Sequence, residues 1–143
     1  MRPADEVKAV LVRQWLEKAR QDLRSCDSLL REDPPLLYPA CFHAQQAAEK
    51  YLKALLAWRG TEFPKTHSIE QLLDLVERAD AAVASQLVEA QGLTAYGVDI
   101  RYPGDQPEPT LEETRRAVGL AGAVRDAVLA IVLPPGRQPS PTE

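Results

Sequence analysis

The chain of 143 residues is poor in the side chains on which metal and redox sites depend: it has two histidines and two cysteines. His43 and His67 each lack a second His or Cys three or four positions further on, so no metal site is predicted. Cys26 and Cys41 lie in separate segments without the spacing of a metal site or a CxxC pair, and we expect two reduced, partly buried thiols. Reduced thiols indicate a cytoplasmic location.

Long apolar runs and a strong positive charge are also missing. No segment approaches the roughly 18 apolar residues of a membrane span, and the first ten residues, "MRPADEVKAV", are too charged for a signal peptide. We therefore expect no contact with a membrane. A net charge of −4 gives no general attraction to nucleic acid, so such contact needs a local basic patch, for which Lys50, Lys53 and Arg59 are available.

Common catalytic motifs are absent as well. The sequence has no Gly-rich phosphate loop, no G-x-S-x-G, no HExxH and no carboxylate run with calcium-loop spacing. Cys41 and His43 do not form a nucleophile–base pair, because positions i and i+2 of a helix point apart. We predict no catalytic residue and no required cofactor.

Helical periodicity is what the sequence does contain. Aromatic residues are sparse at 6%, which leaves the core to Leu, Val and Ala, as in packed helices. Apolar residues recur at helical spacing in five segments. These segments cover about residues 5–31, 39–59, 68–79, 82–96 and 110–132. The fold class predicted is all-α, an up-and-down antiparallel bundle of four long helices plus one short helix. It forms a single domain over residues 1–133, followed by a disordered tail over 134–143.

The ends of these helices carry recognisable signals. Pro39 suits the first turn of the second helix and Gly60 its end. Ser68 begins an S-x-x-Q capping pattern, and Thr110 begins T-x-x-E. The glycines at the end of the fourth segment leave its exit undefined.

The second helix has a crowded polar side. In "HAQQAAEKYLKALLAW", residues 43–58, one arc holds Gln46, Glu49, Lys50 and Lys53, opposite the apolar arc. Glu49 and Lys53 stand four apart with the acid first, which favours an ion pair. On the residues alone, a face that simply meets water is the simpler interpretation, and a binding face is the alternative.

Two further polar positions need an explanation. Asp22 falls at the edge of the apolar stripe of the first helix, where a lone carboxylate is costly, so we expect a cation or donor from another helix and a structural role. Arg101 lies beside a proline-fixed turn and could bind a phosphate bidentately. Spacing alone favours the simpler interpretation, in which Arg101 and Tyr102 hold the loop to the bundle.

Three separated segments carry a family resemblance. "ACFHAQQAAEKYLKALLAWRG", then "FPKTHSIEQLL" and later "IRYP" resemble the HEPN domain proteins, whose name refers to nucleotide binding in higher eukaryotes and prokaryotes. The resemblance extends from Trp15 to Ile131 and includes "WLEKARQDL" in the first helix. It implies a bundle of four to five helices, a homodimer, and a minimal nucleotidyltransferase as partner in a two-gene system, which can be a toxin–antitoxin pair.

The resemblance also implies a nucleotide-binding site for ATP or a similar ligand. Carried over by position, its residues are Gln46, Glu49, Lys50, Lys53, His67, Arg101 and Tyr102. In this hypothesis Lys50, Lys53 and Arg101 hold phosphates. Gln46 reads a base or ribose edge, and Tyr102 stacks on the base. Gln46 and Lys53 are seven residues apart, about 10 Å along a helix, which is comparable to the reach of a nucleotide from base to phosphate.

One departure from the family pattern bears on activity. HEPN ribonucleases share an Arg followed four to six residues later by His, and no histidine follows Arg101 in that range. Without an imidazole, nothing is placed to deprotonate a ribose hydroxyl near neutral pH. The expected function is therefore a non-catalytic nucleotide-binding module, the accessory or substrate-binding partner of a nucleotidyltransferase.

Three alternatives remain open. The first is a toxin ribonuclease with a degenerate site around Arg101, Tyr102 and His67, for which RNA would be the substrate. In the second, the partner enzyme nucleotidylates the hydroxyl of Tyr102. The third is a purely structural dimeric bundle, in which Glu49 and Lys53 with Asp22 form internal bridges.

Overall fold

The computed structural model describes residues 3–97, 102–104 and 107–132. The predicted tail after residue 133 and Arg101 lie outside these ranges. Within them every regular element is helical, so the all-α prediction is confirmed. No helix of this described part is long and apolar enough to cross a membrane.

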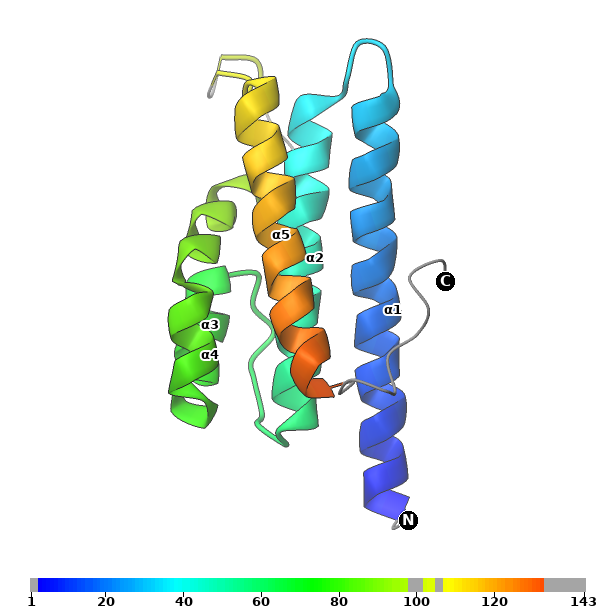
Figure 1. Ribbon diagram of the computed structural model, residues 1–143, viewed down its shortest axis with the longest axis vertical. Helices are drawn as coiled ribbons and strands as arrows, with labels where there is room; N and C mark the ends of the chain where they lie inside the picture. The colour runs from blue at the N-terminus through cyan, green and yellow to red at the C-terminus, as the bar shows by residue number, and fades with distance from the viewer. Residues whose placement is uncertain (1–2, 98–101, 105–106, 133–143) are drawn as a thin grey trace.

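Three long helices dominate the architecture. The elements in chain order are α1 (Pro3–Arg31), α2 (Leu37–Trp58), α3 (Ile69–Ala79), α4 (Ala81–Gln86), the 3₁₀ helix η1 (Val88–Tyr96) and α5 (Leu111–Val132). In Figure 1, α1 runs upward, α2 returns downward beside it, and α5 runs downward in front of α2. The shorter elements α3 and α4 lie on the side of α2 away from α1. The long antiparallel pair of α1 and α2 is thus the frame on which the other helices pack.

The expected fourth long helix over 82–96 is instead two short ones. α4 ends at Gln86, and Leu87 has φ −110° and ψ 10°, outside α-helical geometry. The chain continues as a 3₁₀ helix that contains Gly92, a residue of low helix propensity. Over the described residues the bundle therefore has three long helices, and α3, α4 and η1 together take the place of the fourth.

The predicted helix ends agree with the structure. The Ser68 hydroxyl accepts the backbone N–H of Gln71 at 3.2 Å, which caps α3. Thr110 and Glu113 form a reciprocal capping box at the start of α5, with N···O distances of 2.9 and 3.0 Å. Gly60 follows α2 with φ +73°, a left-handed conformation that glycine adopts without strain.

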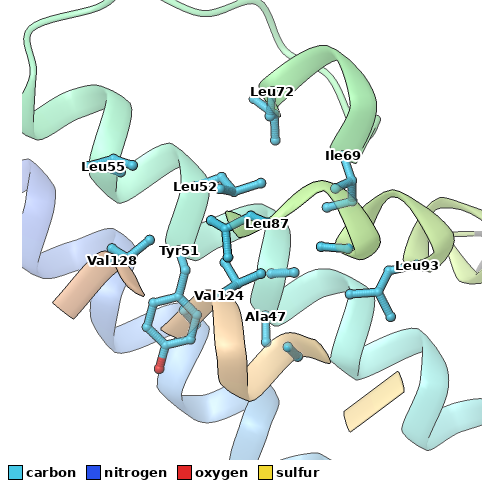
Figure 2. Close-up of a cluster of buried hydrophobic side chains, with 14 of the residues drawn as sticks. Ala47, Tyr51, Leu52, Leu55, Ile69, Leu72, Leu87, Leu93, Val124 and Val128 are labelled. Atoms are coloured by element: carbon cyan, nitrogen blue, oxygen red, sulfur yellow. The ribbon is translucent and has the colours of Figure 1, made fainter. Parts of the chain in front are cut away.

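The apolar core surrounds α2. Figure 2 shows Leu52 and Leu55 of α2 among side chains from α3 and α5, including Ile69 and Val124. Each of these four residues is fully buried or nearly so. Burying one such side chain contributes roughly 1.5–3 kcal/mol, so this cluster is the main source of stability. It also fixes the rotation of α2, and with it the direction in which the polar arc faces.

Candidate functional site

Asp22 joins α1 to α2. Its carboxylate is buried, with Oδ1 at 2.8 Å from His43 Nδ1 and Oδ2 at 2.5 Å from Lys50 Nζ. His43 and Lys50 are seven residues apart, two helical turns, so both reach the same point on α1. The sequence predicted a cation or donor from another helix for Asp22. Two residues of α2, His43 and Lys50, fill this role, one at each carboxylate oxygen.

Glu49 and Lys53 form a second, deeper pair. Lys53 Nζ lies 3.2 Å from Glu49 Oε2, and the other carboxylate oxygen lies 2.9 Å from His67 Nδ1. Glu49 is only 2% exposed and Lys53 6%. A water-facing interpretation of the polar arc is therefore wrong for these two residues. Helical periodicity assigned them to the polar side correctly, but the connector after α2 and the helix α1 cover that side.

Aromatic rings from α1 and the connector cover the buried ion pair. Lys53 Nζ stands 5.3 Å from the centre of the Trp15 ring, within reach of a cation–π interaction. Phe63 of the connector packs edge-on against Trp15, with 6.2 Å between ring centroids. Trp15 Nε1 is buried and has no hydrogen-bond partner among the described residues. The charge of Lys53 is thus enclosed between a carboxylate and an aromatic face.

Gln45 connects the polar arc to two other segments. It is fully buried, accepts a hydrogen bond from Gln46 Nε2 at 2.6 Å and donates to the His67 carbonyl oxygen at 2.9 Å. A Cβ built on Gly97 would come within 3.5 Å of the Gln45 amide and 3.3 Å of the Thr94 carbonyl oxygen. Glycine therefore allows the end of η1 to lie tightly against Gln45. We call the meeting of α2, His67 and Gly97 around Gln45 the Gln45 junction.

The predicted site residues differ in their accessibility. Gln46, Glu49, Lys53 and His67 are all linked, directly or through Gln45. Lys50 belongs instead to the Asp22 cluster, which consists of Asp22, His43 and Lys50. Gln46 and Lys50 are half-buried. The His67 side chain is 77% exposed and Tyr102 is 71% exposed. Arg101 lies outside the described residues, so its place relative to the junction stays a prediction.

The sequence patterns did not single out two residues of this network, Gln45 and His43. Gln45 lies between the apolar and polar arcs of its helix, and periodicity gives no reason to prefer it over Gln46. His43, considered in the sequence only as a metal ligand or catalytic base, shares the Asp22 carboxylate with Lys50. A signal was available for His43, because it lies two turns before Lys50 on the side that faces the costly carboxylate of Asp22.

Burial keeps both thiols protonated. Desolvation by burial, reinforced by Asp27 and Asp22, raises the pKa of Cys26 to about 12. Burial also raises the pKa of Cys41, whose Sγ lies 3.5 Å from Thr114 Oγ1. Both cysteines are free, and both are fully buried where partial burial was expected, so neither has the character of a nucleophile. In the described part of the chain, no group of three or more His, Cys, Asp or Glu could hold a metal ion.

Comparison with known proteins identifies the family. A model of the HEPN domain family matches residues 12–131, which is most of the chain. The chain belongs to the HEPN domain family. The Asp22 cluster and the Gln45 junction both lie within the matched region.

A solved structure supports the same assignment. The HEPN chain is similar to TT1696 from Thermus thermophilus, known from a crystal structure. The two share 37% sequence identity with a TM-score of 0.67, and the match covers 82% of this chain and 94% of TT1696. A search of curated proteins gives no match. The comparisons thus define the family and the fold of the chain.

Proposed function

We propose that this HEPN domain is a nucleotide-binding module that acts as the accessory or substrate-binding partner of a minimal nucleotidyltransferase in the cytoplasm. The observation that supports it best is the Gln45 junction. There the face of α2, the Thr-His connector and Gly97 meet, and Gly97 is followed within five residues by Arg101 and Tyr102. The junction thus joins the α2 face to the Thr-His connector, and the Arg-Tyr-Pro segment follows Gly97 in the sequence.

The accessible polar groups suit a nucleotide. Gln46 offers an amide at the rim of the junction, and the exposed His67 and Tyr102 offer rings on which a base can stack. Arg101 supplies a guanidinium for phosphates, and ATP or a similar nucleotide is the proposed ligand. Lys50 is half-buried at the edge of the same arc and pairs with Asp22, so a phosphate there would share its ammonium group with that carboxylate.

Glu49 and Lys53 take a supporting part in this proposal. Each neutralises the other, and a phosphate could contact Lys53 only if the pair and the Trp15 contact opened. Their role is to hold His67 and the connector in place, because Glu49 joins His67 and Lys53 through its two oxygens. The nucleotide would thus contact the rim of the network and leave its centre intact.

Calorimetric titration of the purified protein with ATP tests the proposal. We expect saturable binding that Arg101→Ala weakens about tenfold or more, the loss expected for a hydrogen bond to a charged phosphate. Gln46→Ala should weaken it several-fold, the loss expected for a neutral hydrogen bond to the base or ribose. Arg115→Ala serves as the control, because Arg115 is an exposed arginine on α5. Melting temperatures of all variants show whether they are folded. Absence of ATP binding, or equal losses in Arg101→Ala and Arg115→Ala, would overturn the proposal.

A ribonuclease function has less support. The chain has only two histidines; His43 pairs with Asp22, and His67 Nδ1 is engaged by Glu49. Neither follows Arg101 at the family spacing. RNA cleavage by the purified protein that disappears in Arg101→Ala would reverse this ranking in favour of the toxin alternative.

Exposure of Tyr102 supports a second role in the same two-protein system. A 71% exposed phenol is accessible to a partner enzyme. Its oxygen could attack the α-phosphate of a nucleoside triphosphate, releasing pyrophosphate while the phenol proton passes to solvent. Mass spectrometry after co-expression with a minimal nucleotidyltransferase should then show the mass of one or more nucleotides on the wild type and none on Tyr102→Phe. An unmodified wild type would exclude this role and leave ATP binding to be judged separately.

A further inference from the structure

An open depression lies on the α1–α2 pair, and none of the residues of the Gln45 junction lines it. Its volume is about 440 Å³, within the range of small-ligand pockets. Five of its six lining residues are polar or charged. The lining consists of Gln21, Arg24, Ser25, Ser28 and Leu29 of α1 and His43 of α2.

The lining is positively charged in an acidic protein. It includes Arg24 and His43 but no carboxylate, although the chain carries a net charge of −4. Arg24 is exposed and forms no ion pair within the described residues. The nearby Asp22 is buried, and its two oxygens are occupied by His43 and Lys50. The only negative charge adjoining His43 in this cluster is therefore offset.

The groups present suit a phosphate. Because the Asp22 carboxylate can only accept, His43 Nδ1 carries the hydrogen of that 2.8 Å bond, and Nε2 is the ring nitrogen that Asp22 does not use. In the neutral ring Nε2 accepts a hydrogen bond from a protonated phosphate oxygen, and in the charged ring it donates one. Arg24 provides a planar guanidinium that matches phosphate oxygens bidentately. Ser28 adds a hydroxyl, whereas the Ser25 hydroxyl already donates to the Gln21 carbonyl at 3.0 Å.

We propose that this depression binds the phosphate group of a small phosphate monoester through Arg24 and His43. It shares no residue with the nucleotide site proposed at the Gln45 junction, so either site can exist without the other. The phosphate can be free or belong to a larger ligand, and two probes separate these sources: inorganic phosphate and phenyl phosphate.

Titration followed by ¹H–¹⁵N NMR tests the proposal on the whole chain. We expect saturable shifts confined to residues 21–29 and to His43 with both probes, and none with chloride at the same ionic strength. Tighter binding of phenyl phosphate would show that the organic part of the ligand also contacts the depression. Shifts that rise linearly, or that chloride reproduces, would overturn the proposal.

Variants of Arg24 provide the matched comparison. Arg24→Ala should weaken phosphate binding tenfold or more, and Arg24→Lys should recover part of it, because lysine restores the charge without the bidentate geometry. The control is Arg13→Ala. Arg13 is exposed and lies eleven residues earlier on nearly the same face of α1, about 16 Å away, and its loss should change affinity less than twofold.

Two further variants separate this site from its neighbours. His43→Gln should weaken phosphate binding, whereas Arg101→Ala should leave it unchanged. ATP binding at the Gln45 junction should show the opposite dependence. Equal affinity of the Arg24→Ala and Arg13→Ala variants for phosphate would contradict the proposal even if ATP still bound at the junction.

Discussion

The two sides of α2 are held in different ways. On one side Leu52 and Leu55 pack with Val124 in an apolar cluster. On the other, Glu49 and Lys53 are equally buried but form a charged pair. Apolar contacts depend mainly on volume, so side chains of similar size can replace one another. A buried charge depends on a particular partner, because an unpaired one is costly. One helix thus combines a tolerant side with a side that accepts few alternatives.

The largest expected effect is on the apolar side. Leu52→Ala should lower the free energy of unfolding by about 4 kcal/mol, because Leu52 is fully buried and its truncation leaves a cavity. Leu52→Met, which keeps the volume, should cost less than about 1.5 kcal/mol. Urea denaturation monitored by circular dichroism measures both. Similar losses in the two variants would show that this side of α2 does not tolerate a change of side-chain shape even when the volume is kept.

The polar side should behave in a non-additive way. Lys53→Ala should cost about 3 kcal/mol, because it leaves the Glu49 carboxylate buried without its cation. Adding Glu49→Gln should return at least about 1 kcal/mol, since a neutral amide is cheaper to bury than a lone charge. The same denaturation assay completes the double-mutant cycle. Costs that simply add would mean that the pair contributes no coupling and that the two sides of α2 do not differ.

The smallest effect concerns the pH dependence of stability and the thiol of Cys26, a residue of α1 that belongs to the buried core. Cys26 has a pKa of about 12 against an ordinary value of 9.0, so above pH 9 the unfolded chain loses this proton while the folded chain keeps it. Stability should therefore fall as pH rises from 9 towards 12, by about 1 kcal/mol at pH 10. The raised pKa values of Cys41, Tyr51 and Tyr96 act in the same direction.

A cysteine variant isolates this contribution. Between pH 8 and pH 10 the free energy of unfolding of Cys26→Ala should fall by about 1 kcal/mol less than that of the wild type, because the variant lacks the Cys26 thiol. Urea denaturation at each pH measures the difference. Other groups that titrate in this range affect both proteins alike. Identical pH dependence in the two proteins would show that the Cys26 thiol is not protected by burial.

The sequence could predict features that depend on neighbouring residues and could not predict features that depend on tertiary packing. The long helices and the caps at Ser68 and Thr110 follow from local patterns, because hydrophobic period and cap chemistry act within a few residues. The break at Leu87 did not follow, since the apolar spacing continues across it. Deciding between one long helix and two short ones depends on tertiary packing, which outweighs weak propensities.

The candidate site was only partly accessible to such reasoning. The sequence placed Glu49 and Lys53 four apart in the favourable order, and their ion pair exists. It could not show that they are buried, because the segments that cover them are a connector with no period and a tryptophan on another helix. The central place of Gln45 depends on Gly97, more than fifty residues further along the chain.

The burial of both thiols has a practical consequence for studying the protein. Since Cys26 and Cys41 are the only cysteines and both are buried, maleimide reagents should leave the native chain unlabelled. A single substitution such as Ser28→Cys or Tyr102→Cys would then create a unique attachment point for a fluorophore or spin label, with no native cysteine removed. Movement of either surface could be followed by fluorescence or electron paramagnetic resonance in an otherwise unaltered molecule.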